Sequence, residues 1–127
     1  MPLIEFPYTL HKGFLLPIIP ITVLSHWGWA FVDSGAAFTI LSVDDARRIG
    51  IDWQRGRQQM IMVGDGSFIP VFFHDLSIQI DKWQVNAPIG FSERLGVGFN
   101  LLGRKGIFDQ FQVCFNDHIR KVTFQKI

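Results

Sequence analysis

The stretch FVDSGA, residues Phe31–Ala36, decides how the rest of this 127-residue sequence is interpreted. An apolar run leads into a single acid, Asp33, and a small hydroxyl residue and a glycine follow it. We expect Asp33 to lie on a tight turn at the end of a buried strand, where Gly35 lets the backbone approach a ligand closely. Ser34 supplies a hydroxyl group that can brace the loop. Because Asp, Ser and Gly are common turn residues, the string taken alone fits an ordinary turn.

The sequence on either side of this stretch predicts an all-β domain. Short apolar runs are separated by Gly, Pro and Asp at intervals typical of such domains. The 13 phenylalanines also favour strands, since aromatic side chains suit a sheet. Pro17 and Pro20 indicate an edge strand or a bulged path. The expected strands are Leu3–Leu10, Leu15–Leu24, Trp27–Val32, Gln58–Val63, Ser67–Phe73, Leu76–Ile80, Trp83–Ile89, Phe99–Leu102, Gln112–Asn116 and Lys121–Gln125.

One segment, Ser42–Ile49, has the pattern of a helix. Ser42 can cap its first turn, and Asp45 three residues later completes a capping box. Acidic residues come first and basic residues last, which suits the helix dipole. Gly50 follows at the position where a left-handed residue ends many helices. A second helical segment of one or two turns is expected within Gly106–Phe111.

The composition of the chain excludes several classes of protein. A hydrophobic fraction of 48% and a charged fraction of 18% argue against disorder. The net charge is +1 and the basic residues are scattered, so nucleic acid is not an expected partner. The length predicts a single domain over residues 1–127. The most apolar stretch, Phe14–Leu24, is too short to span a bilayer, so no membrane contact is expected within this chain.

Cys114 is the single cysteine, which excludes an intrachain disulfide and a zinc site built from thiolates. Its place in an alternating pattern predicts a buried side chain. A lone thiol is compatible with a reducing compartment, and we expect a cytoplasmic location. The four histidines lack the spacing of metal ligands, so neither a metal nor a cofactor is expected. Packing in the core or in substrate subsites is expected for Trp27, Trp29, Trp53 and Trp83.

Two later features change the interpretation of the Asp33 turn. A glycine-tipped hairpin is expected around Gly64–Gly66, and an apolar strand ends in the hydrophobic-hydrophobic-Gly motif Leu101–Gly103. In this order, the Asp-Ser-Gly-Ala loop with Thr39, the hairpin and the later motif resemble the retropepsin-like aspartic proteases. The resemblance extends over residues 14–124.

The resemblance implies a closed barrel or sandwich of the acid-protease type, with the Leu101–Gly103 strand threaded beside the Asp33 loop. In this family a water molecule lies between two aspartates. This sequence holds one such loop and is too short for two lobes, so two copies must form a homodimer in which Asp33 and Asp33′ face each other. Two close carboxylates share one proton. The charged one would activate the water, and the protonated one would donate to the scissile carbonyl oxygen of a peptide substrate.

The resemblance also implies roles for the neighbouring residues. Ser34 would brace the catalytic loop, and the carbonyl of Gly35 would accept a substrate amide. The hairpin tip would be a flap that closes over an extended peptide. The expected substrate-binding residues are Ser34, Gly35, Ala36, Ala37, Gly64, Asp65 and Gly66, and the expected supporting residues are Thr39, Leu101, Leu102 and Gly103.

The sequence departs from the retroviral pattern beside the catalytic motif. Ala37 and Phe38 stand where the retroviral enzymes carry polar or acidic residues. Arg104 resembles an arginine that pairs with one of those acids, and here it either pairs with Asp109 or Asp44 or remains solvated. The hairpin tip carries no tyrosine, unlike that of the two-lobed pepsins.

Three functions fit these observations. An aspartic endopeptidase is the first, because the motif is intact. An inactive module of the same fold that binds peptides or mediates dimerisation is the alternative, since motifs can outlive activity. A small β-barrel that carries a ligand is the third. In a dimer, the C-terminal hairpin Gln112–Gln125 is either the interface between copies or an edge within one chain.

Overall fold

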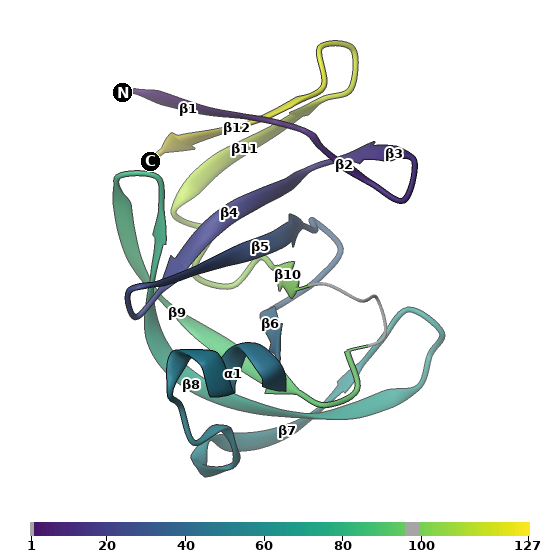
Figure 1. The fold of residues 1–127 in the computed structure, drawn as a ribbon, viewed down its shortest axis with the longest axis vertical. Coiled ribbons are helices and arrows are strands. Elements are labelled where there is room, and N and C mark those ends of the chain that lie inside the picture. The colour runs from purple at the N-terminus through teal and green to yellow at the C-terminus, as the bar shows by residue number, and fades with distance from the viewer. Residues whose placement is uncertain (1, 96–99) are drawn as a thin grey trace.

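The structure of the chain is a computed structural model that describes residues 2–95 and 100–127. The described residues are mostly strands with one short α-helix, which confirms the predicted all-β class (Figure 1). The strands are β1 (Leu3–Pro7), β2 (Thr9–His11), β3 (Phe14–Leu16), β4 (Ile18–Val23), β5 (His26–Val32), β6 (Thr39–Ser42), β7 (Arg57–Met62), β8 (Phe68–Ile80), β9 (Trp83–Ser92), β10 (Asn100–Leu102), β11 (Phe111–Asn116) and β12 (Lys121–Lys126). The helices are α1 (Val43–Ile49) and the short 3-10 helix η1 (Trp53–Arg55).

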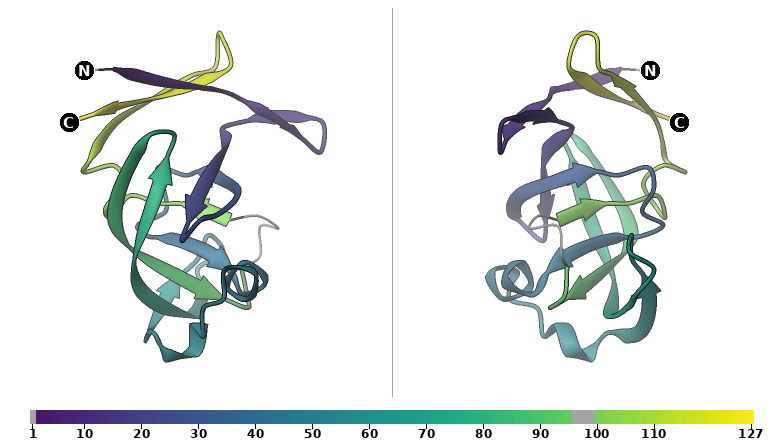
Figure 2. Two further views of the ribbon diagram at one scale, coloured as in Figure 1. Left: turned by 60° about the vertical axis from the view of Figure 1, so that its left-hand side comes forward. Right: turned by 90° about the vertical axis from the view of Figure 1, so that its right-hand side faces the viewer.

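The main sheet has the strand order β4-β5-β10-β6-β9-β8-β7. Strand β10 lies parallel to β5 and antiparallel to β6, so a short strand from late in the chain separates two early ones. Strand β4 also pairs with β8 at Thr22 and Val23, so the first strand in this order contacts the next-to-last one. The strong twist of the sheet is visible in both views of Figure 2.

A second sheet carries both ends of the chain, in the order β1-β12-β11. The C-terminal hairpin therefore lies within a sheet of its own chain. The Tyr8 hydroxyl donates to the Asp117 carboxylate at 2.7 Å, and the Tyr8 amide donates to the Arg120 carbonyl at 2.8 Å. Partial burial, together with the hydrogen bond to Asp117, raises the pKa of Tyr8 to about 12.

Apolar side chains from both sheets form one continuous core. Phe91 of the main sheet and Phe111 and Phe124 of the terminal sheet are among its largest fully buried members. A smaller cluster lies under the β7–β8 hairpin and contains Ile40, Ile69, Val71 and Phe73. Removal of these side chains from water stabilises the arrangement of the two sheets.

Helix α1 forms where the sequence predicts it. The Ser42 hydroxyl accepts a hydrogen bond from the Asp45 amide at 3.2 Å, which is one half of the predicted capping box. The other half is absent, because the Ser42 amide donates to the Asn100 side chain and the Asp45 carboxylate accepts from the Ser42 hydroxyl. Gly50 ends the helix with φ 89°, in the left-handed region that glycine tolerates. Val43 and Ala46 are buried and hold the helix against the sheet.

Two expected strands are interrupted. The predicted strand Leu3–Leu10 breaks at Tyr8, whose amide bonds to the terminal sheet. The predicted strand Leu15–Leu24 breaks at Pro17, which has no N–H for a strand ladder. Between the breaks, a two-residue turn at Lys12–Gly13 forms the small β2–β3 hairpin.

Other predicted boundaries also change. Ser67–Phe73 and Leu76–Ile80 belong to one long strand, β8, and the next strand continues to Ser92. Residues 104–110 form turns with helix-like hydrogen bonds but no regular helix. Phe99, the first residue of another expected strand, lies outside the described residues, and β10 begins at Asn100.

The predicted burial of Cys114 is wrong, and two of the four tryptophans lie outside the core, which was one of the two places expected for them. Cys114 is exposed on β11, at the edge of the terminal sheet. Trp27 and Trp29 are 58% and 46% exposed and contact each other edge to face, outside the core. Trp53 and Trp83 do pack against the core. None of the helices in the described part of the chain has the length and apolar character needed to cross a membrane.

Candidate active site

The Asp33 loop begins where β5 ends and is fixed to β10 by its first residue. The Asp33 amide donates to the Leu102 carbonyl at 3.0 Å, and one residue earlier the Val32 amide donates to the Pro17 carbonyl at 2.8 Å. The chain then turns back, and the Ala36 amide donates to the Asp33 carbonyl at 3.2 Å. This is the tight turn that the sequence predicts, and the strand before it is buried at Ala30 and Val32 but not along its whole length.

The Asp33 carboxylate is half-buried and held by its own loop. One of its oxygens accepts a hydrogen bond from the Gly35 amide at 2.9 Å. A Cβ atom at Gly35 would lie 3.3 Å from that carboxylate oxygen, closer than most such contacts. Glycine therefore leaves room for the carboxylate beside the backbone, as expected for a residue that must face a ligand.

The segment that follows β10 holds the remainder of the loop. The Arg104 and Lys105 amides donate to the Ala36 and Ala37 carbonyls, each at 2.9 Å. The Gly103 amide donates to the hydroxyl of Thr39, a residue with no exposed surface, at 3.0 Å. Two segments more than sixty residues apart in sequence are thus joined by a continuous set of hydrogen bonds.

Gly103 is where these two segments come closest. A Cβ atom there would lie 2.2 Å from the carbonyl carbon and oxygen of Phe38 and 2.8 Å from the Thr39 amide nitrogen. Leu101 lies in register with Phe31 on one side and Ile40 on the other. The hydrophobic-hydrophobic-Gly strand therefore lies directly beside the Asp33 loop, as the family resemblance implies.

The predicted flap residues lie at the tip of the β7–β8 hairpin and are all exposed. The tip is closed by its own bonds, with the Ser67 hydroxyl and amide both donating to the Asp65 carboxylate. These bonds hold the pKa of Asp65 below its usual value. Figure 1 places the tip on the same side of the molecule as the β5–β6 connection that contains Asp33. Among the described residues, no hydrogen bond or ion pair joins Gly64, Asp65 or Gly66 to that loop.

Of the two alternatives for Arg104, an ion pair within the chain or a solvated side chain, the structure has the second. The Arg104 side chain is exposed and forms no ion pair with a described residue, so pairing with Asp109 or Asp44 does not occur within one chain. Asp44 instead pairs with Arg47 at 3.1 Å. Ser34 is exposed on the loop surface. The described residues contain no group of three or more side chains suited to hold a metal ion.

A hollow of about 410 Å³ lies beside the Asp33 loop. Residues of the loop and of the turns that follow β10 both line it, and one of them is the half-buried Phe108. Charged side chains surround it. The residues that line it are Gly35, Ala37, Arg104, Lys105, Phe108 and Asp109.

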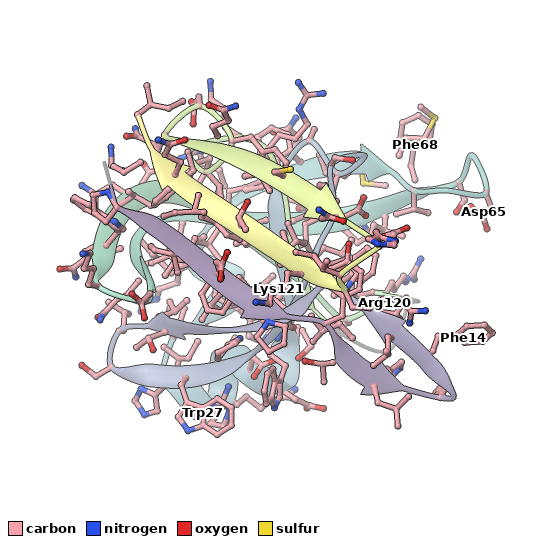
Figure 3. All side chains as sticks on the ribbon, turned by 90° about the horizontal axis from the view of Figure 1, so that it is seen from above. Phe14, Trp27, Asp65, Phe68, Arg120 and Lys121 are labelled. Carbon is pink, nitrogen blue, oxygen red and sulfur yellow. The ribbon has the colours of Figure 1, made fainter. Side chains whose placement is uncertain are left out.

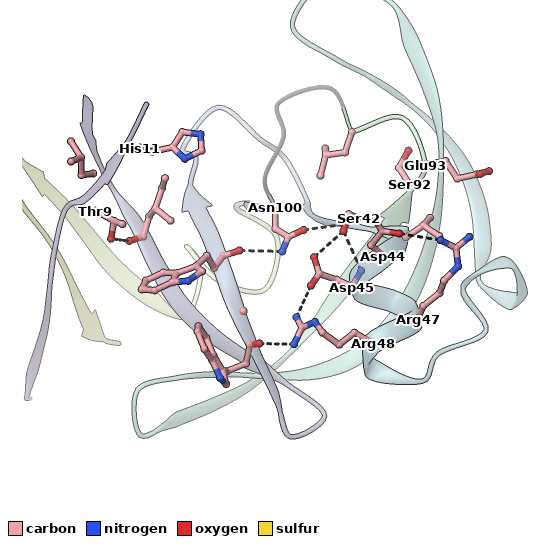
Figure 4. A pocket seen from close by; sticks show the side chains of 17 residues that line it. Thr9, His11, Ser42, Asp44, Asp45, Arg47, Arg48, Ser92, Glu93 and Asn100 are labelled. Atoms are coloured by element: carbon pink, nitrogen blue, oxygen red, sulfur yellow. Dashed lines mark hydrogen bonds and ion pairs between the residues drawn. The ribbon is translucent and has the colours of Figure 1, made fainter. Parts of the chain in front are cut away.

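A larger cavity of about 1040 Å³ lies between β5, the β2–β3 hairpin and α1 (Figure 4). At its centre the Asn100 side chain accepts from the Ser42 amide and donates to the Trp29 carbonyl. Burial acts to raise the pKa of Asp45, but hydrogen bonds from Arg48, Asn100 and Ser42 and the charge of Arg48 lower it overall. This network holds the start of α1 against β5.

Asn100 has a positioning role that the sequence reasoning did not identify. Its side chain joins β5 to the start of α1, and it begins the strand that contacts the Asp33 loop. The available signal was a polar residue inside an apolar run, Phe99–Leu102. A buried polar group of that kind needs hydrogen-bond partners.

Comparison with known proteins shows the fold. The chain is similar to the crystal structure of a retropepsin-like aspartic protease from Rickettsia conorii, with a TM-score of 0.73 and 18% identity, over 97% of this chain and 91% of the other. It is also similar to EIAV protease complexed with the inhibitor HBY-793, with a TM-score of 0.57 and 16% identity, over 76% and 88%. No family model and no curated protein matches the sequence. The chain therefore has a retropepsin-like fold.

Proposed function

We propose that the chain is an aspartic endopeptidase that acts as a homodimer. The observation that supports this most strongly is the position of Asp33, on a hydrogen-bonded turn at the end of β5 with Gly35 packed against its carboxylate. The retropepsin-like fold is the second support. We take residues 1–127 as one protease domain in this proposal.

In the proposed dimer, Asp33 and Asp33′ meet across a two-fold axis and share a single proton, since two adjacent carboxylates repel each other when both are charged. The charged carboxylate removes a proton from water, and the water oxygen attacks the scissile carbonyl carbon. The protonated carboxylate donates its proton to the carbonyl oxygen, which gives a neutral tetrahedral intermediate. Collapse of the intermediate breaks the C–N bond. The amine leaves with the proton of the now protonated carboxylate while the charged carboxylate takes a proton from a hydroxyl group of the intermediate, so the dyad again holds one proton.

The β7–β8 hairpin is the proposed flap. Its tip, Gly64–Gly66, lies on the same side of the molecule as the β5–β6 connection (Figure 1). An extended peptide would lie between this tip and the loop and would bond through its main chain to Gly35 and Ala36. Closure of the tip would exclude bulk water from the reacting carbonyl group.

The proposal is tested by incubating the purified chain with a peptide library between about pH 4 and pH 7. Cleavage is expected from the wild-type protein and from Asp81→Asn, a carboxylate change in the distant β8–β9 turn, where the positive φ also suits asparagine. No cleavage is expected from Asp33→Asn. The rate should be highest in the acidic to mildly acidic range, because one proton must remain on the dyad.

Two results would contradict the proposal. Equal cleavage by wild type and Asp33→Asn would show that another group performs the reaction. A rate that keeps rising through about pH 9 would exclude a singly protonated carboxylate pair. Peptide binding without cleavage by the wild-type protein would instead favour the inactive module of the same fold.

A further inference from the structure

Most of the large exposed apolar side chains lie on three hairpins that project from one side of the molecule, and the others lie on the β4–β5 hairpin and at the chain ends. Figure 3 shows Phe14, Asp65 and Phe68 at the outer end of two of these hairpins, on the same side as Arg120 in the third. Exposed apolar residues in soluble proteins are usually scattered, and concentrated ones mark a surface that is covered by a partner. Those on the three hairpins are Leu10, Phe14 and Leu15 on β2–β3, Met60, Met62 and Phe68 on β7–β8, and Phe115 and Ile119 on β11–β12.

The β2–β3 hairpin lies beside the Asp33 loop. Strand β4 runs antiparallel to β5, with Ile18 opposite Phe31, and the Pro17 carbonyl accepts from the Val32 amide. If the register between β4 and β5 is continued beyond Ile18, Leu16 lies opposite Asp33. The hairpin therefore lies beyond the end of β5 at which the Asp33 loop begins.

This hairpin is small, and the Thr9 hydroxyl ties its first strand to the Ile18 carbonyl of β4 at 2.8 Å. It has three residue pairs and belongs to neither of the larger sheets, and an isolated two-stranded hairpin is marginally stable in water. Its turn is well formed, because Lys12 and Gly13 both adopt the positive φ of a two-residue hairpin turn. Phe14 at this turn is nevertheless 70% exposed and Leu10 is 68% exposed.

The hollow beside the Asp33 loop is suited to receive an apolar side chain. Its volume is about 410 Å³, and Phe108, Ala37 and Gly35 supply apolar surface within it. The exposed Arg104 side chain at its edge has no ion-pair partner among the described residues. A guanidinium group in this position can stack on an aromatic ring.

We propose that the β2–β3 hairpin is an intersubunit arm whose Phe14 side chain occupies the hollow beside the Asp33 loop of a second copy of this chain. The inference rests on the proposed function, which requires a second copy at the Asp33 side of the molecule. A two-fold axis makes the contact reciprocal, so each copy supplies one arm and one hollow. The arm of each copy then forms a wall of its partner's active site, and the site is incomplete in a single chain.

Sedimentation velocity of the dilute wild-type protein and of Phe14→Ser tests the arm. The expected result is an increase of the dimer dissociation constant by about tenfold or more, as for a central aromatic residue of an interface. Leu24→Ser is the matched control, since Leu24 is 46% exposed in the β4–β5 turn, at the other end of β5 from Asp33. Its dissociation constant should remain within about twofold of the wild-type value.

Directed cross-linking tests the position of the arm independently of affinity. In a Cys114→Ser background, protein with Phe14→Cys is mixed with a size-tagged protein carrying Ala37→Cys and then oxidised. A disulfide-linked heterodimer is expected, because position 14 of one copy would lie against position 37 of the other. Absence of the heterodimer, or links between two Phe14→Cys chains alone, would overturn the proposed geometry.

The outcomes separate this inference from the proposed function. A wild-type dimer that Phe14→Ser leaves unchanged would refute the arm and leave the protease proposal standing. A wild-type chain that stays monomeric at every concentration, with and without a peptide-mimicking inhibitor, would refute both. A weakened Phe14→Ser dimer together with the expected heterodimer would support the arm.

Discussion

Replacement of Gly103 by alanine should separate the Asp33 loop from β10. The new Cβ atom would lie 2.2 Å from the carbonyl carbon and oxygen of Phe38, which are backbone atoms that cannot rotate away. Ordinary contact begins at 3.4 Å, so the two backbones must move apart by 1.2 Å, the difference between 3.4 and 2.2 Å. The bonds from Gly103, Arg104 and Lys105 to the loop, now 2.9–3.0 Å long, would then be broken or badly stretched.

The size of the effect follows from these contacts. Each lost hydrogen bond costs about 1 kcal/mol of the free energy of unfolding, and forced overpacking adds about 1–3 kcal/mol. The sum over the three bonds and the overpacking is a loss of about 4–6 kcal/mol for Gly103→Ala. For a chain of this length, such a loss lowers the melting temperature by roughly 10–20 °C.

Thermal unfolding followed by tryptophan fluorescence, at one fixed chain concentration, measures this effect. Gly64→Ala is the matched control, because a Cβ atom at Gly64 meets nothing within 4 Å. The control should unfold within about 0.5 kcal/mol of the wild-type protein. A Gly103→Ala variant that also unfolds within about 1 kcal/mol of wild type would refute the close packing of β10 against the loop.

Three further predictions concern single polar contacts. Thr39→Val leaves the Gly103 amide without its acceptor, and urea unfolding should show a loss of about 1–3 kcal/mol. Phenolate absorbance of Tyr8, the single tyrosine, should titrate near pH 12 while the protein is folded, and Asp117→Asn should lower that midpoint. The pKa of Asp45 is lower in the folded protein than in the unfolded chain, so its contribution to stability is present above the unfolded value and lost as the pH falls through the folded one. Asp45→Asn should therefore flatten the loss of stability that urea unfolding detects between about pH 5 and pH 2.

Each of these predictions has a control or a contradicting result. Thr22→Val changes a half-buried threonine on β4 in the same way and should alter stability by less than about 1 kcal/mol. A phenolate midpoint near pH 10 in the folded protein would show that the hydroxyl of Tyr8 is not bonded to Asp117 in solution. An unchanged acid dependence in Asp45→Asn would show that this carboxylate is not held by its neighbours in solution.

Local features of the fold could be predicted from the sequence. The boundaries of α1 follow from Ser42, Asp45 and Gly50, because caps depend on neighbouring residues. The turn at Asp33 and the tip at Gly64–Gly66 are local for the same reason, since glycine and short polar residues determine turn geometry. The alternation of apolar residues predicted where most of the strands lie, but not the residues at which they begin and end.

Contacts between distant segments could not be derived from such patterns. The break at Tyr8 depends on its bond to Arg120, far away in the sequence. The exposure of Cys114 depends on β11 lying at the edge of the terminal sheet, which the alternation of one strand cannot reveal. The hydrogen bonds of Asn100 join it to Trp29 of β5 and to Ser42 at the start of α1, and these two elements meet Asn100 only in the folded chain. The hairpin around Lys12–Gly13 was hidden because the prolines around it suggested longer, bulged strands.

Subunit mixing tests most directly whether two copies share one catalytic centre. A fixed amount of wild-type protein is mixed with increasing amounts of Asp33→Asn, left to exchange subunits, and assayed for peptide cleavage. A shared centre predicts that activity falls to about half at equal amounts and approaches zero with excess variant, because mixed dimers hold one acid. Asp81→Asn should instead add activity in the same assay. Wild-type activity that stays constant as Asp33→Asn is added would contradict a site built from two chains.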